Sequence, residues 1–348
     1  MDLKKAETKK DRDRVDAYIA AHPLATPYHL TAWLSAVEAA YGLAGETFFS
    51  LQDGEIAGVV SRVLMPRLLG GKSYCALPYC DVGGVLADNA ELGDQIWTAL
   101  HSLDNSDAVH ARRETASLPL DVDALKVQEE TKQGVKARLV LPLLANSDDM
   151  LASFKSKLRS QIRKSDKNGV QCEVSTDVEG FFGVMQKNMH RLGSPCHSRA
   201  WFEQILESYA DNARLFIATF EGQIVGGSIT LRCGSKVAVP WASTLSEYNR
   251  LSPNMLMYWT MLSTAINDGA ECFDFGRSTI GEGTYRFKRQ WGAEVYPLMW
   301  RDYRGGEVLP ASTSSRSGLG EAVVKTWTKL PPWLVNRLGP VVRPYISL

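Results

Sequence analysis

The chain contains an internal repeat, and this repeat limits its fold more than any other feature. Ala32-Trp33 recurs as Ala200-Trp201, 168 residues later. The segment 53–58, Asp-Gly-Glu-Ile-Ala-Gly, recurs with the same separation as Glu-Gly-Gln-Ile-Val-Gly at 221–226. A repeat of this length predicts a duplicated domain. A chain of 348 residues agrees with two domains of roughly 150 residues each.

Each copy of the repeat predicts the same order of elements: an amphipathic helix, a hairpin around an acidic-Gly turn, a proline-containing strand, a helix and a strand. The expected ranges are 31–41, 47–64, 73–79, 91–103 and 108–112 in the first copy, and 199–209, 215–231, 236–243, 253–267 and 271–275 in the second. This order resembles the GNAT acyltransferase fold. We therefore expect an α/β (α+β) protein with two tandem GNAT-like domains, 1–147 and 148–308, followed by a linker at 309–320 and an amphipathic tail at 321–348.

The segment 148–169 between the copies predicts a basic helix, capped by Ser147 or Asp148 and ended by Asn168-Gly169. One face is apolar, at Met150, Phe154, Leu158 and Ile162. An adjacent row is cationic, at Lys155, Arg159, Arg163 and Lys167. Like charges one turn apart repel each other. The row is therefore either a solvated face or a contact for an anionic ligand or partner.

The overall composition excludes several classes of protein. Lys and Arg (39) balance Asp and Glu (39), so no global field attracts the chain to nucleic acid or to an anionic membrane. The charged N-terminus lacks the apolar core of a secretory signal, and no apolar run is long enough to span a bilayer. The cysteines and histidines show no metal-ligand spacing, and Cys196-His197 is interpreted as a buried cysteine beside a loop histidine. We expect a cytoplasmic protein with no metal site.

The tail allows two interpretations. It combines Trp327 and Trp333 with basic residues at Lys325, Lys329, Arg337 and Arg343. Tryptophan beside basic residues is typical of a peripheral contact with a membrane, here the inner membrane. Alternatively, the tail packs back on the preceding domain.

Polar and aromatic residues are densest between 239 and 300. The segments there are Val-Pro-Trp-Ala-Ser at 239–243, Tyr-Asn-Arg-Leu-Ser-Pro-Asn-Met at 248–255, Asp-Phe-Gly-Arg-Ser at 274–278 and Tyr-Arg-Phe-Lys-Arg-Gln-Trp-Gly at 285–292. The last segment, with Arg-Ser-Gln-Ile-Arg-Lys at 159–164, resembles the motifs of the Fem peptidyltransferase family. The others, with Asn-Met-His-Arg-Leu-Gly-Ser-Pro at 188–195, resemble a FemAB-like branch associated with exosortase and PEP-CTERM systems.

The resemblance implies a transferase that forms an amide on a phosphate-bearing precursor of the cell envelope or of an exopolysaccharide. It implies aminoacyl-tRNA as donor, with tRNA as a partner. Lys288, which aligns with the lysine of the Fem motif, would stabilise the oxyanion or bind the donor phosphate. Arg277 could bind a phosphate or carboxylate, and Asp274 could orient Arg277 or the attacking amine, or form a structural ion pair with it. The expected substrate-binding residues are Arg159, Arg163, Lys164, Lys167, Asn188, Trp241, Ser243, Tyr248, Asn249, Asn254, Tyr258, Ser278, Tyr285 and Gln290.

Two alternatives remain open. The first is a CoA-dependent N-acyltransferase with acyl-CoA as donor. The loop 243–254 contains no glycine, whereas GNAT proteins usually bind the CoA pyrophosphate with a glycine-rich loop at this point. The second is a non-catalytic module that binds an anionic or lipid-linked glycan.

Overall fold

The computed structural model describes residues 2–67, 70–103, 109–114, 136–304, 307–310 and 324–347. From the N-terminus to the strand that follows the first copy of the repeat, the elements are β1 (Lys4–Lys5), α1 (Lys9–Ala21), η1 (Pro27–His29), α2 (Thr31–Tyr41), β2 (Gly45–Gln52), β3 (Glu55–Pro66), β4 (Lys72–Cys75), β5 (Leu86–Ala87), α3 (Ala90–Ser102), β6 (Val109–Glu114) and β7 (Lys136–Pro142). The elements that follow are α5 (Ser147–Ser153), α6 (Ser156–Lys167), β8 (Val170–Ser175), α7 (Val178–Arg191), α8 (Arg199–Tyr209), η2 (Ala210–Asn212), β9 (Ala213–Phe220), β10 (Gln223–Cys233), β11 (Lys236–Thr244), η3 (Ser246–Leu251), α9 (Pro253–Asn267), β12 (Cys272–Thr279), α10 (Gly283–Arg289), β13 (Glu294–Arg304) and β14 (Glu307–Pro310). The tail contains α12 (Pro332–Val342) and η4 (Arg343–Tyr345).

The predicted repeat is present in the structure. The order α2-β2-β3-β4-α3-β6 in the first copy matches α8-β9-β10-β11-α9-β12 in the second. Both hairpins turn through two residues with positive φ, Asp53-Gly54 and Glu221-Gly222. Positive φ at both central residues is the geometry of the tight type I′ hairpin turn. The expected tandem GNAT-like fold is confirmed.

The two copies share their strands across one continuous path, in the order β1-β2-β3-β4-β6-β13-β7-β12-β11-β10-β9-β8. Strand β7 follows the first copy in sequence but pairs with β12 of the second copy and with β13. Strand β13 pairs with β7 through 294–297 and with β6 through 298–303. The chain thus crosses twice between the two halves of this sheet, once before β7 and once within β13. The expected boundary between 147 and 148 stays a prediction.

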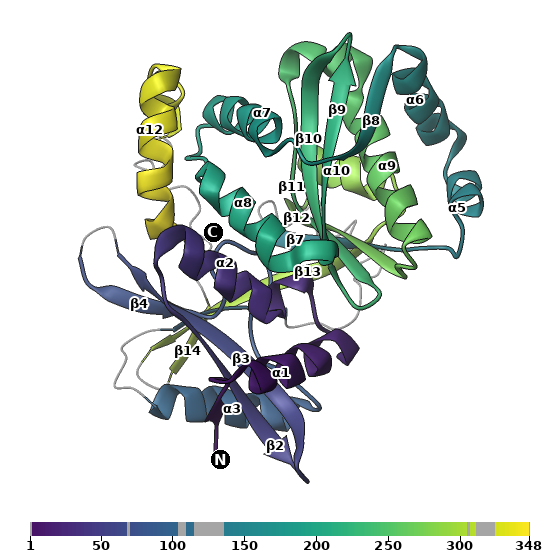
Figure 1. Ribbon diagram of the computed structural model, residues 1–348. Helices are drawn as coiled ribbons and strands as arrows, with labels where there is room; N and C mark the ends of the chain where they lie inside the picture. Colours follow the sequence, from purple (N-terminus) through teal and green to yellow (C-terminus); the bar gives the residue numbers. More distant parts are fainter. Residues whose placement is uncertain are drawn as a thin grey trace.

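The two copies also share a hydrophobic core. Helices α2 and α8, one from each copy, lie against each other (Figure 1). Trp33 on α2 packs edge-on against Trp201 on α8, with ring centroids 5.3 Å apart, and parallel to Trp241 at 6.0 Å. Trp33 and Trp201 correspond to each other in the repeat and are both fully buried. The interface between the copies is therefore built from the repeated tryptophan itself.

The single helix expected over 148–169 is wrong in its start and its continuity. The cap is Asn146, whose side chain accepts from the Asp149 N–H, and the helix breaks between α5 and α6. Phe154 and Lys155 have extended backbone there, and Phe154 packs edge-on against Trp291 at 5.4 Å. The expected end at Asn168-Gly169 and the buried apolar row are confirmed.

The described part of the tail packs on the rest of the chain, as one of the two interpretations expects. Helix α12 lies beside α7 (Figure 1). From residue 311 on, the expected linker lies outside the described residues. In the described ranges, no helix combines the length and the hydropathy needed to cross a bilayer.

Candidate functional site

A large cavity lies where two parallel strands separate. Strands β11 and β12 pair only from Lys236–Cys272 to Ala238–Asp274, and both continue beyond this point. A cavity of about 680 Å³ opens between their diverging ends. The residues that line it from these strands are Val239, Pro240, Trp241, Ala242 and Ser243 of β11, and Phe275, Gly276 and Arg277 of β12.

Tyr258 of α9 and Thr284 and Lys288 of α10 also line the cavity, and the remaining walls come from three more distant parts of the sequence. The region of the first copy provides Tyr28, Tyr79, Cys80 and Asp81. Helix α7 and the loop after it provide Met185, Asn188, Met189 and residues 192–197. The tail provides Val324, Arg343 and Ile346. The cavity therefore exists only because both copies and the tail meet at this point.

Lys288 is the main ionisable group on the wall from α10. Its side chain is largely buried, and Nζ donates to the carbonyl oxygens of Gly276 at 3.1 Å and Arg277 at 2.8 Å. Burial lowers the pKa of Lys288 to about 8, although the carboxylates of Asp81 and Asp274 oppose this shift. A protonated lysine has three donors, so one N–H remains for a ligand in the cavity.

A bulge in β12 directs the backbone toward Lys288. The register with β7 shifts between Asp274 and Arg277, and Gly276 has φ +71°. This left-handed conformation favours glycine, because a Cβ is strained there. The Asp274 carboxylate accepts from the Gly276 N–H at 2.8 Å and so holds the bulge.

Asp274 and Arg277 each have an oppositely charged partner on another strand or loop. Asp274 lies 3.6 Å from the Nε of Arg138 on β7. Arg277 lies 3.5 Å from Asp81, which also accepts from the Arg277 backbone N–H at 3.0 Å. Burial raises the pKa of Asp274, and the charge of Arg138 opposes this shift. Asp274 thus lies behind the cavity wall, while Arg277 lies on it.

Several expected site residues do lie together in the cavity. Besides Lys288 and Arg277, the wall contains Asn188, Trp241, Ser243 and Tyr258. Asn188 on α7 donates to the hydroxyl of Ser243 on β11 at 2.9 Å, so this pair joins two walls.

Other expected residues lie elsewhere. Tyr285 is buried in the core of the second copy, Gln290 contacts the sulfur of Met255 at 3.9 Å, and Tyr248 in η3 donates to Gln223 at 2.8 Å. Ser278 is buried in β12, Asn249 lies in η3, and Asn254 lies at the start of α9. None of these residues is on the described cavity wall.

The basic residues of α6 are also remote from the cavity. Helix α6 packs on α9 and β8, on the opposite side of the second copy from α7 (Figure 1). Arg163, Lys164 and Lys167 are exposed there. Arg159 instead donates to the carbonyl oxygens of Ala152 at 2.7 Å and Phe154 at 2.9 Å, at the break between α5 and α6. One member of the cationic row therefore has a structural role.

Sequence reasoning missed Asp81 and the importance of His197. Asp81 corresponds to the expected residue Ser243 in the repeat, since both follow the Pro-aromatic pair by two positions. His197 is buried, its Nε2 accepts from Arg343 Nε at 2.9 Å, and its Nδ1 lies 2.5 Å from the Tyr41 hydroxyl. Burial and the charge of Arg343 lower the pKa of His197 well below its usual value, so the ring is neutral. His197 thus links the tail to α2.

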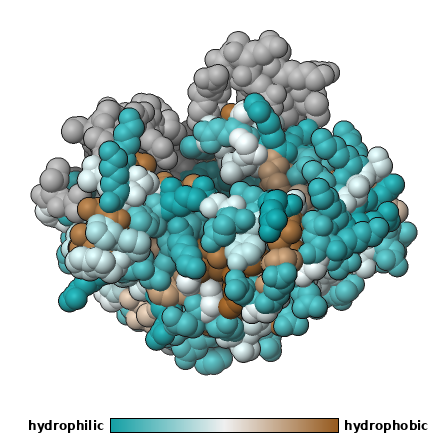
Figure 2. All heavy atoms as spheres, turned by 90° about the horizontal axis from the view of Figure 1, so that it is seen from above, coloured by the Kyte–Doolittle hydropathy of each residue, from teal (hydrophilic) through white to brown (hydrophobic). Residues whose placement is uncertain are grey.

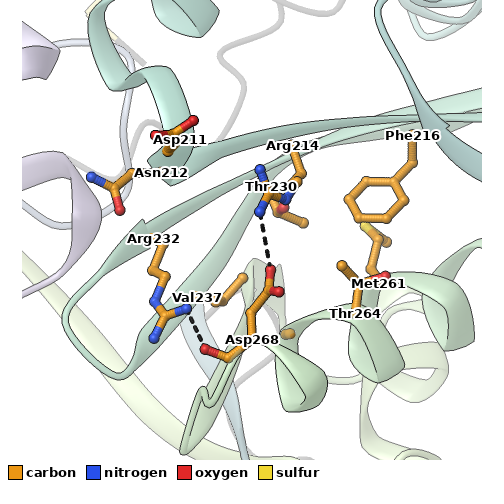
Figure 3. Close-up of a pocket in the computed structure, with 11 residues that line it drawn as sticks. Asp211, Asn212, Arg214, Phe216, Thr230, Arg232, Val237, Met261, Thr264 and Asp268 are labelled. Atoms are coloured by element: carbon orange, nitrogen blue, oxygen red, sulfur yellow. Dashed lines mark hydrogen bonds and ion pairs between the residues drawn. The ribbon is translucent and has the colours of Figure 1, made fainter.

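A second, smaller cavity of about 250 Å³ lies where the β9 and β10 strands meet the end of α9 (Figure 3). Arg214 forms an ion pair with Asp268 at 3.5 Å, and Arg232 donates to the Asp268 carbonyl oxygen at 2.5 Å. Asp211 and Asp268 balance the two arginines, and none of the expected site residues lines this cavity. It has no excess charge to attract an anionic substrate.

Within the described ranges, no cluster of three or more His, Cys, Asp or Glu side chains is arranged to hold a metal ion. The six cysteines are all free.

Comparisons with known proteins agree with this architecture. Residues 152–289 match the family model described as an acetyltransferase (GNAT) domain. Lipid II:glycine glycyltransferase of Staphylococcus haemolyticus is 21% identical over 370 residues, covering 80% of this chain and 87% of that protein. The protein of the same name from Staphylococcus aureus is also 21% identical, over 376 residues, with the same coverage.

Solved structures show the same fold. The crystal structure of FemX has a TM-score of 0.69 at 18% identity and covers 88% of this chain and 98% of that one. A tandem GNAT protein from the clavulanic acid biosynthesis pathway has a TM-score of 0.53 at 10% identity, with 88% and 99% coverage. These matches confirm the predicted resemblance to Fem proteins, and leave the association with exosortase systems as a prediction. The chain has a tandem GNAT-like fold, and over most of its length it is similar to Fem-type glycyltransferases.

Proposed function

We propose that this protein is a Fem-type aminoacyl or acyl transferase that forms an amide on a cell-envelope precursor in the cavity between β11 and β12. The observation that carries the proposal is Lys288, a buried lysine on the wall of a cavity built jointly by both copies. The similarity to lipid II:glycine glycyltransferases over 80% of the chain supports the class of reaction.

The proposed reaction is acyl transfer to an amine. The acceptor nitrogen attacks the carbonyl carbon of the activated donor, the C–N bond forms and the bond to the leaving oxygen or sulfur breaks. The nitrogen loses a proton and the leaving group gains one. Negative charge develops on the carbonyl oxygen, and a cationic N–H donor inside a protein stabilises that charge strongly. Lys288 in its protonated form can supply this donor.

Arg277 would bind an anionic group of the substrate, such as a phosphate or carboxylate. A guanidinium has five N–H donors, so Arg277 can contact Asp81 and a ligand together. Asp81 then orients Arg277 and adds a negative charge that favours protonated Lys288. Asn188 and Ser243 offer neutral polar contacts on the opposite wall.

We propose aminoacyl-tRNA as the donor and a phosphate-bearing, lipid-linked precursor as the acceptor, which places the reaction at the inner leaflet in the cytoplasm. The exposed cations of α6 would contact the tRNA phosphates, because salt-dependent backbone contacts dominate nucleic-acid binding. The alternative acceptor is an exopolysaccharide precursor of an exosortase-linked system. It is supported only by the motifs at 188–195, 248–255 and 274–278. Acyl-CoA is the weaker donor candidate, since η3 has no glycine and contributes no residue to the described cavity wall.

A thermal-shift panel tests the proposal on the purified protein with acetyl-CoA, a long-chain acyl-CoA, aminoacyl-tRNA, a UDP-sugar peptide and a soluble diphosphate lipid analogue. A ligand at 100 times its Kd stabilises the folded state by about 2.7 kcal/mol. We expect stabilisation by the precursor analogues and by tRNA. Replacing Arg163 and Lys167 by Gln should reduce the tRNA shift only. Stabilisation by the CoA thioesters alone would contradict the proposal.

A further inference from the structure

The outer face of the tail is unusually apolar for a protein surface. Nine large apolar side chains are exposed among the described residues, and four of them lie in α12 and η4: Trp333, Leu338, Val341 and Tyr345. Trp333 is 69% exposed and Val341 is 64% exposed. Seen from above, the molecule shows apolar patches within a mainly hydrophilic surface (Figure 2). Clustered apolar side chains on such a surface indicate a contact site.

The opposite face of the same helix is firmly packed. Val335 is 3% exposed, and a Cβ added at Gly339 would lie 3.2 Å from the Cys196 backbone. After the helix, Arg343 donates to His197, and the Ser347 carbonyl oxygen accepts from the Tyr79 N–H at 2.8 Å. One face of α12 therefore packs on the rest of the chain. The exposed apolar side chains lie on its other face, where they are available to contact a second molecule or a surface.

The charge of the tail identifies the kind of partner. From 322 to 348 the sequence contains four basic residues and no acidic residue. Lys325, Lys329 and Arg337 are exposed, whereas Arg343 faces inward. Arg337 lies between Trp333 and Val341 at helical spacing, so cationic and apolar groups share one face. Trp and Tyr beside basic residues match the interface of an anionic bilayer.

We propose that α12 and η4 dock on the surface of an anionic lipid bilayer. Trp333, Val341 and Tyr345 enter the headgroup region, and Lys325, Lys329 and Arg337 contact lipid phosphates. The same segment provides Val324, Arg343 and Ile346 to the cavity wall. Docking thus brings the cavity to the membrane surface. The value of this placement for a lipid-linked acceptor rests on the proposed function, but the docking itself does not.

Vesicle sedimentation with the full chain and no substrate tests this proposal. We expect binding to phosphatidylglycerol-containing vesicles and much weaker binding to pure phosphatidylcholine. The double variant Trp333→Ser/Val341→Ser should lose at least about tenfold in partitioning, because both side chains lose apolar contact with the bilayer. Val174→Ser is the matched control, because Val174 is 51% exposed on the edge strand β8, outside the tail. It should bind like the wild type.

Charge is tested separately. Lys325→Gln/Lys329→Gln should lose the preference for anionic vesicles, and Lys164→Gln/Lys167→Gln on α6 should keep it. Equal binding by all variants, or no binding by the wild type, would overturn the proposal. Light scattering without vesicles should show a monomer. A dimer that Trp333→Ser dissociates would show instead that the apolar face of α12 binds a second copy of the chain. Transfer to a water-soluble acceptor should stay unchanged in the tail variants, which separates this test from that of the proposed function.

Discussion

The chemistry of the cavity depends on the charge state of one residue. The pKa of Lys288 is about 8 because burial disfavours its ammonium form. If the ammonium stabilises the oxyanion, activity must fall as pH rises through this value. A neutral lysine acting as a base would give the opposite dependence. The pH profile therefore distinguishes the two roles.

We expect kcat/KM of the wild type to fall above pH 8, by up to tenfold per pH unit. In Lys288→Arg this falling limb should disappear up to about pH 10, because a guanidinium stays protonated. The arginine also changes the geometry, so the level of activity will drop while the shape of the profile reports the charge. A wild-type rate that rises through pH 8 to a plateau, with the rise lost in Lys288→Arg, would assign Lys288 as a base.

Asp81 provides a second test at the residue scale. Asp81→Asn removes a negative charge that favours the protonated lysine, so the falling limb should move to lower pH. Asp268→Asn, in the smaller cavity, should leave the limb in place. If the two variants have the same profile, Asp81 does not act on Lys288.

At the scale of elements, the bulge in β12 is where this strand forms part of the cavity wall. Gly276 has φ +71°, and a Cβ there would lie 3.4 Å from the Asp81 carboxylate. Gly281, in the turn after β12, has φ +85° with open space around it. Alanine at either position has a similar backbone cost of about 1–2 kcal/mol in unfolding free energy. Only the change at 276 strains the bulge whose carbonyl oxygens accept from Lys288 Nζ.

We therefore expect Gly276→Ala and Gly281→Ala to lose comparable stability in chemical denaturation, and only Gly276→Ala to lose activity, by at least tenfold. Comparable activity in the two variants would show that the bulge does not position the site.

The elements were largely predictable from the sequence, because helix periodicity and tight-turn residues are local signals. The helices at 31–41, 199–209 and 253–267 agree with α2, α8 and α9 to the residue. The exchange of β7 and β13 was not predictable, because strand pairing between distant segments leaves no local pattern. The helix break at Phe154 was also hidden, since Phe154 continues the apolar spacing on either side.

The site was predictable only in part, for the same reason. The motifs located Lys288, Arg277, Trp241 and Ser243, which the splayed strands and α10 bring together. Asp81 and the tail residue Arg343 come from other parts of the chain, and only the folded structure brings them to the cavity. The position of the basic helix away from the cavity was not predictable, because charge alone does not reveal which side of a domain a helix occupies.

At the scale of the whole molecule, the basic helix lies away from the cavity. The cavity lies between the two copies and is lined in part by the tail. Helix α12 lies beside α7, and α6 lies on the far side of the second copy (Figure 1). An acceptor at a membrane and a large anionic donor could therefore approach from different sides. The shared tryptophan core fixes the two copies relative to each other, and this keeps Asp81 next to Arg277.

The most direct test is single-turnover transfer of a labelled amino acid from aminoacyl-tRNA to a lipid-linked or UDP-linked peptide precursor. The wild type is compared with Lys288→Met and with the control Lys10→Met, which replaces an exposed lysine on α1. We expect an amide product with the wild type and with Lys10→Met, and a loss of at least a hundredfold with Lys288→Met despite retained binding of the precursor. Equal product formation by Lys288→Met would contradict the assignment of the cavity as the site of transfer.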